Sequence, residues 1–359
     1  MKGWFNYVDI GSIDSELKQI NSIQKINWGQ ASSRARQIIR QGDTLFSTVR
    51  VNLERIAYVE DDITDAIAST GFTVLRGSNA VDPRYLFYAV TRPSFIKKLV
   101  RLQKGTAYPA VTDKIIFDQE IPLPPLQEQK QLVNLFQTID QAIDQVENQQ
   151  SQLLQLRHGL CDGLIFGQPY FGDMLSNESC LPLLLEAFAD SIEEHDKAKT
   201  DITRFVGLEN IEPGEFIIKS WGNIEDGTTF TKRFRVGDVL FGKRRAYLKK
   251  VAVATFDGIC SSDILVLRAK PEKILPGLLP FYISADPFIE YAVTTSAGSL
   301  SPRTKWKDLA KFEISLPDLK TQEKILSVLQ GIETTRLQLT NQKANLKKLK
   351  QQLLNEILG

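Results

Sequence analysis

Residues 124–160 read PPLQEQKQLVNLFQTIDQAIDQVENQQSQLLQLRHGL, and residues 317–353 repeat this stretch as PDLKTQEKILSVLQGIETTRLQLTNQKANLKKLKQQL, about 193 residues later. Both copies keep an apolar ladder with the spacing 3, 4, 3, 4, which is typical of a coiled-coil seam. In the first copy the ladder is Leu132, Leu135, Ile139, Ala142, Val146, Gln149, Leu153, Leu156 and Leu160, and in the second it is Ile325, Val328, Ile332, Thr335, Leu339, Gln342, Leu346, Leu349 and Leu353. The repeat predicts two long helices.

We expect the two helices to pair with each other, because both carry the same seam. The alternative is that each helix packs only on its own globular part. A rod of about 30 residues would be roughly 45 Å long, slightly more than one turn of B-DNA, ~34 Å. An antiparallel pair would place the two globular parts at opposite ends, which fits a spacer.

The repeat extends through the globular parts. The aligned segments are Tyr7–Ile10 with Phe205–Leu208, Arg40–Phe46 with Arg235–Phe241, Phe87–Tyr88 with Phe281–Tyr282, and Gly105–Pro109 with Gly298–Pro302. We therefore predict an α+β fold in which two similar mixed α/β domains are separated by a long antiparallel two-helix coiled coil. The predicted boundaries are a first domain at 1–123, a first helix at 124–160, a connector at 161–180, a second domain at 181–317 and a second helix at 318–359.

Short strands are expected within 7–75 and 205–267, where Val, Ile, Phe and Thr alternate with turn residues. Two helices are expected near Pro83–Thr91 and Ser94–Gln103, the first capped by Asp82. Residues 181–204 have no counterpart before Tyr7, so the first copy is expected to be shorter at its start. Whether residues after Arg157 contribute to the packing of the first domain stays open.

Composition places the chain among globular proteins of two or more domains. With a net charge of +1, any nucleic-acid surface must come from local clusters of basic residues. Three widely spaced cysteines predict neither a disulfide framework nor a structural zinc site. We expect no signal peptide and no membrane span, and a cytoplasmic location.

Catalytic constellations are scarce in this sequence. Its two histidines, His158 and His195, have no ligand partner at the spacing of a metal site, and there is no phosphate-binding glycine loop. The string Asp82-Pro83-Arg84-Tyr85 is close to the D-P-P-Y of amino-methyltransferases, but helix capping is favoured. Glu128-Gln129-Lys130 has the E-x-K form of many nucleases and is interpreted as charge at a helix start. We expect no metal, no cofactor and no catalytic residue.

The positive signal is the clustering of basic residues with aromatics and hydroxyls on turns, which suits contacts to phosphates and base edges. Candidates for phosphate contacts are Lys104, Lys243, Lys249, Lys250 and Lys305. Candidates for base contacts are Arg50, Asn52, Thr106 and Tyr108 in the first domain and Arg244, Arg245, Tyr247 and Arg303 in the second. These loops differ between the copies while the frame repeats, as two different target sequences would require.

Together, Ile121-Pro122-Leu123-Pro124-Pro125-Leu126-Gln127-Glu128-Gln129, the Gly-Asp-x-Leu-Phe turn and the Gly-Thr/Ser loop resemble the specificity subunit of type I restriction-modification systems. The resemblance spans nearly the whole chain and occurs twice. It implies two target-recognition domains, each reading one half of a split DNA sequence, with the coiled coil setting the spacer. It also implies partners: two modification subunits that methylate adenine with S-adenosylmethionine, and restriction subunits that use ATP to translocate and cleave DNA.

The predicted function is therefore that of a non-enzymatic DNA-binding subunit. Two alternatives stay open: a single-chain restriction endonuclease or DNA methyltransferase, and a scaffold whose duplicated domains bind proteins. Turnover by the purified chain alone would favour the first. DNA retention that is insensitive to salt would favour the second.

Overall fold

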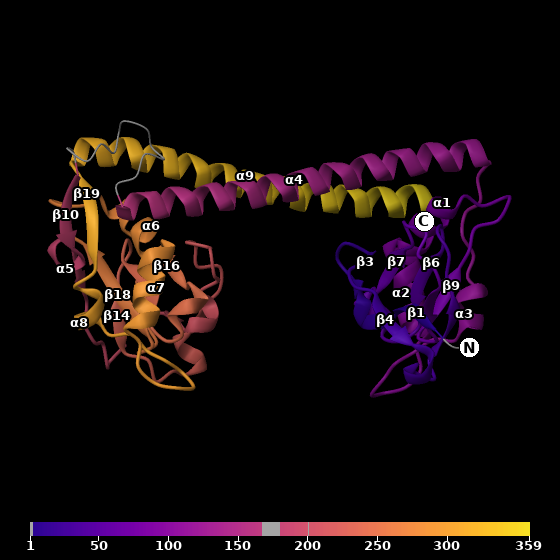
Figure 1. Cartoon of the computed structure of the whole chain (residues 1–359), viewed down its shortest axis with the longest axis horizontal. Coiled ribbons are helices and arrows are strands. Elements are labelled where there is room, and N and C mark those ends of the chain that lie inside the picture. The colour runs from indigo at the N-terminus through magenta and orange to yellow at the C-terminus, as the bar shows by residue number, and fades with distance from the viewer. Residues whose placement is uncertain (1–2, 167–179, 200) are drawn as a thin grey trace. The chain divides into compact units, whose positions relative to one another are not determined.

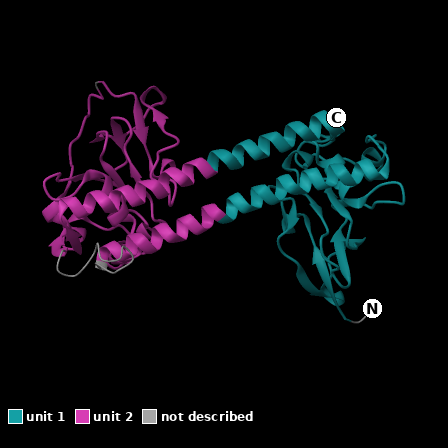
Figure 2. Ribbon diagram, turned by 90° about the horizontal axis from the view of Figure 1, so that it is seen from above, with its two compact units in different colours: residues 1–148, 340–359 teal, residues 149–339 magenta. Residues whose placement is uncertain are grey.

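The structure is a computed structural model that describes residues 3–166, 180–199 and 201–359. The chain divides into two compact units (Figure 2): unit 1 contains residues 1–148 and 340–359, and unit 2 contains residues 149–339. Two long helices, α4 (Leu126–Phe166) and α9 (Leu319–Leu358), are labelled in Figure 1, and each contributes one segment to each unit. Each unit thus joins one globular domain to segments of both helices.

Unit 1 contains two main sheets among its described residues. In the four-stranded sheet the order is β4-β1-β8-β5, and in the three-stranded sheet it is β7-β6-β9. The strands are β1 (Trp4–Val8), β2 (Ile13–Asp14), β3 (Gln19–Ile20), β4 (Gln24–Asn27), β5 (Ala35–Ile38), β6 (Thr44–Ser47), β7 (Ile56–Tyr58), β8 (Ala66–Ser69) and β9 (Phe72–Leu75). Three helices follow them: α1 (Pro83–Thr91), α2 (Pro93–Leu102) and α3 (Asp113–Phe117).

Unit 2 repeats this plan with additional strands. Its two main sheets have the orders β13-β12-β17-β14 and β11-β18-β15-β16 among the described residues, and β10 pairs with β19. The strands are β10 (Cys180–Leu184), β11 (Ala189–Ser191), β12 (Arg204–Val206), β13 (Gly222–Asn223), β14 (Lys232–Phe234), β15 (Val239–Gly242), β16 (Val251–Val253), β17 (Gly258–Cys260), β18 (Ile264–Ala269) and β19 (Glu313–Pro317). The helices are α5 (Leu185–Phe188), α6 (Leu279–Ser284), α7 (Asp286–Thr294) and α8 (Trp306–Leu309).

The duplication predicted from the sequence is confirmed strand by strand. The central strands β1 and β12 each pair in parallel with a later strand, β8 and β17. Strands β6 and β15 follow the repeated Gly-Asp turn, and every residue of both strands is buried. Within that turn Asp43 accepts hydrogen bonds from Arg76, and Asp238 accepts them from Arg268. The motif is therefore repeated because its carboxylate is buried and paired with arginine in both domains.

The repeated glutamine of the helix start has the same function in both units. Gln129 and Gln322 are completely buried. The Gln129 side chain accepts a hydrogen bond from the Asp82 amide and donates to the carbonyls of Ala80 and Pro124. Gln322 makes the corresponding three bonds, to Leu275, Lys273 and Pro317. Each glutamine thus fixes the start of a long helix to the loop that leads into the helices of its domain, and Glu128-Gln129-Lys130 is a structural segment.

Helix bounds largely follow the predictions. Helix α1 spans Pro83–Thr91, and the Asp82 carboxylate accepts hydrogen bonds from the amides of Arg84 and Tyr85, as expected of an N-cap. Helix α4 continues to Phe166, six residues past the expected end, so the start of the predicted connector is helical. Residues 167–179 of that connector lie outside the described part of the chain. Leu160, Cys161 and Leu164 belong to the core of the second domain.

The two long helices pair antiparallel within each unit. In unit 1 Lys350 pairs with Asp140, and Lys343 lies 2.8 Å from Glu147, so seven residues forward on α4 correspond to seven backward on α9. In unit 2 Arg157 of α4 lies 2.9 Å from Glu333 of α9. Leu354 and Leu358 of α9 pack in the same apolar cluster as Val133 and Phe136 of α4. The predicted pairing of the helices is therefore confirmed within both units.

The predicted ladder, however, was wrong at every second position except Ala142, which is half-buried. Leu135, Leu156, Val328 and Leu349 are between 40% and 51% exposed, and Gln149, Thr335 and Gln342 are exposed as well. The buried positions lie one residue further on, at Phe136, Ile143 and Leu329. The reason is that each helix also packs on its own domain, as Phe136 does on Tyr88 with 5.0 Å between ring centroids. A helix that packs on both the other long helix and its own domain buries a different face than a helix that packs only in a two-helix seam.

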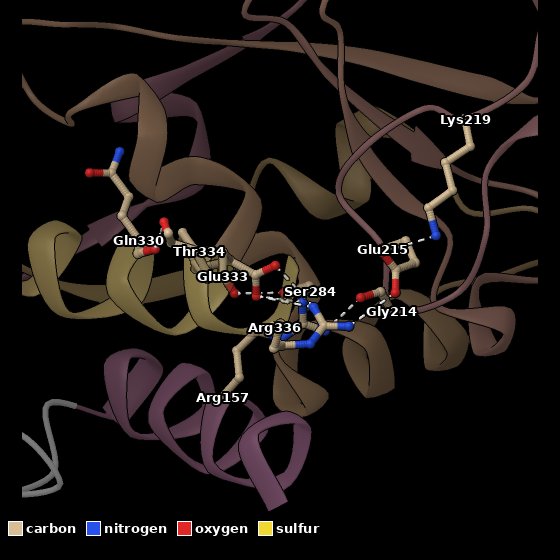
Figure 3. Close-up of polar contacts among 10 residues, drawn as sticks. Arg157, Gly214, Glu215, Lys219, Ser284, Gln330, Glu333, Thr334 and Arg336 are labelled. Carbon is tan, nitrogen blue, oxygen red and sulfur yellow. Dashed lines mark hydrogen bonds and ion pairs between the residues drawn. The ribbon is translucent and has the colours of Figure 1, made fainter. Parts of the chain in front are cut away.

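A buried arginine connects the helices of unit 2 to the globular domain (Figure 3). Arg157 is only 2% exposed; it donates to Glu333 and, at 2.9 Å, to the carbonyl of Gly214. Its guanidinium lies over the ring of Phe216, 4.9 Å from the centroid. Arg336 also pairs with Glu333, and through its other nitrogen with Glu215. Both helices are thus attached to the loop around Gly214.

At the corresponding joint of unit 1 there is a cavity of about 510 Å³. Its lining includes Lys18 from the β2–β3 hairpin, Tyr88 from α1, Asp144 from α4 and Lys350 from α9. Here α9 holds the hairpin through Lys347, which pairs with Glu16. Joint 1, as we call it, is therefore open and lined by charged groups, whereas joint 2, around Arg157, is filled.

Candidate nucleic-acid interface

The predicted contact residues cluster around one strained turn in each domain. The turn of the first domain runs from Arg50 to Glu54, and that of the second from Arg245 to Lys249. All four of these end residues have positive φ values, between 49° and 55°. Side chains rarely adopt this left-handed conformation, and such strain concentrates at functional sites. We call these segments the basic turns.

The loop that carries the repeated Gly and Pro packs beside the basic turn in each domain. Residues 104–110 form it in the first domain and residues 297–303 in the second, closed by paired backbone bonds between their ends. The Arg50 amide donates to the carbonyl of Pro109, and the Arg245 amide donates to that of Pro302. Gly105 and Gly298, at φ values of 100° and 109°, allow the loops to reverse. We call these segments the recognition loops.

The structure therefore brings together Arg50, Asn52, Lys104, Thr106 and Tyr108 in the first domain. Arg50 is exposed; its guanidinium donates to the carbonyl of Ala107 and lies over the ring of Tyr108, 5.0 Å from the centroid. Tyr108 itself is 72% exposed. An arginine next to an exposed aromatic ring is suited to phosphates and stacked bases.

In the second domain the structure brings together Arg244, Arg245, Tyr247 and Arg303. The Arg245 guanidinium donates to the carbonyl of Leu300, which is the same bond that Arg50 makes in the first domain. Arg244 and Arg303 both pair with Asp263, the closest approach being 2.7 Å from Arg303. Burial alone would raise the pKa of Asp263, but the bonds and charges of Arg303 and Arg244 prevail and lower it. Asp263 therefore stays ionised at neutral pH.

The lysine candidates divide into two groups. Lys249 pairs with Asp286, and Lys250 donates to the carbonyl of Leu208, so both are engaged within the domain. Lys104 and Lys305 are exposed, and Lys243 is half-buried beside Asp263, to which its backbone amide is bonded. Lys250 corresponds to Arg55, which donates to the carbonyl of Ile10 in the first domain. Both residues hold the turn that follows the central strand.

Sequence reasoning missed Asp263 and Ser301. Ser301 accepts a hydrogen bond from Arg244 at 3.2 Å. Asp263 follows β17 and is 40 residues distant from Arg303 in the chain, so no local spacing links them. Aligning the two copies could have pointed to Asp263, because it is a charged residue at the position of Gly71 in the first domain. The Gly71 carbonyl accepts from the Thr48 amide. The Asp263 carbonyl accepts from the amide of Lys243, the residue equivalent to Thr48.

No three His, Cys, Asp or Glu side chains in the described part of the chain form a group that could hold a metal ion. Burial lowers the pKa of His158 on α4, and it raises the pKa of the Cys161 and Cys260 thiols to about 12. Among the described residues, no helix combines the length and apolar character required to cross a bilayer.

Comparisons with known proteins agree on one family. The family described as "Type I restriction modification DNA specificity domain" matches residues 2–156 and 190–348. The EcoDI specificity subunit of Escherichia coli is 30% identical over 136 residues, which cover 36% of this chain and 30% of that protein. The MjaVIII specificity subunit of Methanocaldococcus jannaschii is 21% identical over 315 residues, 81% of this chain and 73% of that protein.

A solved structure supports the same assignment. It was determined in work on the "complex assembly and conformational transition of the type I R-M system". That chain is 26% identical, with a TM-score of 0.64, and the similarity covers 99% of this chain and 91% of that one. The chain therefore belongs to the family of type I restriction-modification specificity proteins, and its two globular domains are DNA-recognition domains of that family.

Proposed function

We propose that this chain is the DNA-binding specificity subunit of a type I restriction-modification complex, in which each domain reads one half of a bipartite target. One observation carries the proposal: an arginine-bearing strained turn and a recognition loop occur twice, in the same backbone arrangement, on two domains linked by paired helices. A duplicated reader of this kind requires a target with two parts. The proposed location is the cytoplasm, where such a complex would meet DNA.

The DNA contacts in this proposal lie on the basic turns and recognition loops. Arg50, Asn52, Lys104, Thr106 and Tyr108 would contact one half-site. Lys243, Arg244, Arg245, Tyr247, Arg303 and Lys305 would contact the other. Lys249 and Lys250 already have partners inside the domain, Asp286 and the carbonyl of Leu208, and their contact with phosphates stays a prediction.

The proposal is tested by a mobility-shift titration of the full chain on duplex DNA between 50 and 200 mM salt. If the interface neutralises six or more phosphates, affinity should fall by at least about 10³-fold over this range. Affinity that does not change with salt would favour the protein-binding scaffold. Cleavage or methylation of DNA by the purified chain alone would favour the single-chain enzyme.

We also propose that the chain binds two modification subunits and that restriction subunits associate with them. The exposed apolar residues of the long helices support it, because they come in equivalent pairs, Leu135 with Val328 and Leu156 with Leu349. Large apolar side chains exposed at equivalent places suit a partner that binds twice. In this proposal, catalysis, S-adenosylmethionine and ATP belong to the partners.

Leu135→Glu and Val328→Glu test this assignment. Each should lower the amount of modification subunit that co-purifies with the chain, because a charge would enter an apolar contact. Binding of the free chain to DNA should not change, since both residues are exposed on the long helices and belong to neither the basic turns nor the recognition loops. Full co-purification of the double variant would contradict the proposed docking face.

A further inference from the structure

The two domains share some contact groups and differ in others. Arg50 and Arg245 have the same backbone conformation and the same hydrogen bonds in the two domains. Both adopt the left-handed conformation, both donate their amide to a proline carbonyl of the recognition loop, and both donate a guanidinium hydrogen to a loop carbonyl, at 3.4 and 3.3 Å. The sugar-phosphate backbone recurs identically in any two half-sites, whereas the bases change with sequence, and phosphates are the backbone groups that attract an arginine.

The neighbouring positions have diverged on the same backbone. Arg244 bridges to Arg303 in the second domain, where the first domain has Val49 bridging to Ala110. Asp263 stands in the place of Gly71. The second domain thus carries an Arg244–Asp263–Arg303 triad, and the first has three small or apolar residues. A difference confined to side chains on a repeated frame is what distinct base sequences demand.

The geometry leaves the arginines able to contact a base. Asp263 accepts from Nε and Nη2 of Arg303, at 2.7 and 3.4 Å. Nη1 of Arg303 also donates to the carbonyl of Ser301, at 3.5 Å. Because a guanidinium has five N–H donors, one hydrogen on Nη1 and one on Nη2 remain for a second acceptor pair. Arg303 is exposed, with 47% of its side chain accessible, while Asp263 is largely buried at 17%. The carboxylate thus holds the arginines from beneath and reduces the entropy lost when they bind.

We propose that Arg303 and Arg244, held in position by Asp263, contact guanine edges in the half-site of the second domain; this inference rests on the proposed function. Arg50 and Arg245 bind phosphates in the half-sites of their own domains, whatever the base sequence. Guanine presents two acceptors, O6 and N7, that match the paired donors of arginine. The first domain lacks the triad, so its half-site carries no guanine requirement from these positions.

The test is selection of bound duplexes by the full chain from a library with two randomised blocks at varied separation. The wild type should select a bipartite motif with guanine at one or two positions of one half. Arg303→Lys keeps the charge but loses the planar fork, and it should reduce discrimination at those positions by about 5- to 150-fold. Preferences in the other half should stay as in the wild type.

Asp263→Asn should weaken preference at the same positions as Arg303→Lys, and by less, because both arginines remain. A merely structural role would lower affinity without changing base preference. Asp263→Glu, which restores the carboxylate, should recover part of the guanine preference.

Arg50→Ala and Arg245→Ala should weaken binding to all sequences alike and lower the salt dependence by about one ion each. Circular dichroism checks that each variant is folded.

The outcomes separate the two proposals. A wild-type motif that Arg303→Lys and Asp263→Asn leave unchanged overturns the triad assignment. Altered base preference in Arg50→Ala or Arg245→Ala overturns the anchor assignment. A wild type that selects no bipartite motif overturns the proposed function itself, and this inference with it.

Discussion

Joints 1 and 2 both attach the long helices to a globular domain. Joint 2 is packed around a buried arginine, whereas joint 1 is an open cavity lined by charged groups. In joint 2 the buried Arg157 fills the space between the helices and the domain, and Phe216 packs on Phe281 with ring centroids 5.0 Å apart. Joint 1 instead keeps a cavity of about 510 Å³, with Lys18 in its lining. The ion pairs are also reversed. Lys350 with Asp140 in unit 1 corresponds, 193 residues apart, to Arg157 with Glu333 in unit 2.

This difference teaches that the duplicated frame is maintained by backbone order and buried motifs, while the groups that attach domain to helix are free to diverge. Burying a charge is costly unless it is paired. Joint 2 therefore depends on its partners far more than joint 1, whose charges are hydrated. The stability of the two units should respond differently to equivalent substitutions.

Arg157→Ala should have the largest effect. Removing the guanidinium leaves a void beside Phe216, but Glu333 retains Arg336 as a partner. We expect unit 2 to lose about 2–4 kcal/mol of unfolding free energy. Hydrogen exchange in residues 149–339 measures this loss, with residues 1–148 as the internal reference. Unchanged protection in unit 2 would show that joint 2 is not braced by Arg157.

Lys350→Ala is the equivalent change in unit 1 and should cost far less, about 0.5–1 kcal/mol. Lys350 is partly exposed, and its ammonium lies over the ring of Tyr88, 5.3 Å from the centroid, so both contacts are weakened by water. The same exchange experiment compares the two units directly. Equal losses for Arg157→Ala and Lys350→Ala would remove the distinction between the joints.

Tyr88→Phe and Tyr282→Phe form a second matched pair. The Tyr88 hydroxyl donates to Asp140 at 2.8 Å, whereas the buried Tyr282 hydroxyl has no hydrogen-bond partner among the described residues. Thermal unfolding should show a loss of about 1 kcal/mol for Tyr88→Phe and none, or a slight gain, for Tyr282→Phe. A larger loss at Tyr282 would mean that its hydroxyl is bonded in solution.

Asp144→Asn should have the smallest effect, and one that depends on pH. Burial, followed by the charges of Asp140 and Glu147, raises the pKa of Asp144. A raised pKa means that the ionised carboxylate destabilises the folded state above that pKa, so the amide should raise the thermal midpoint slightly at pH 7. The gain should fade as the pH falls through the raised pKa of Asp144, because the carboxyl is then protonated. A gain that is independent of pH would exclude this electrostatic cause.

Much of this fold could be predicted from the sequence because the chain contains two copies of one module, and each copy can be aligned with the other. Repeated Pro124 and Pro317, Gln129 and Gln322, and the Gly-Asp turns located both domains and both helices, since each motif fixes a backbone feature locally. The apolar ladder was misplaced at Leu135 and Leu156 because periodicity alone does not reveal that a helix packs against two neighbours. Asp263 and Arg157 were missed because their partners lie far away in the chain, at Arg303 and Glu333.

We propose that the paired helices set the gap between the two half-sites. Inserting one heptad into both helices, after Asn148 and after Leu339, tests it most directly, with the selected DNA motif as the readout. Seven helical residues add ~10 Å, so the gap should lengthen by about three base pairs at 3.4 Å each, with both half-sites unchanged. A gap of unchanged length, or altered bases in either half-site, would contradict the account.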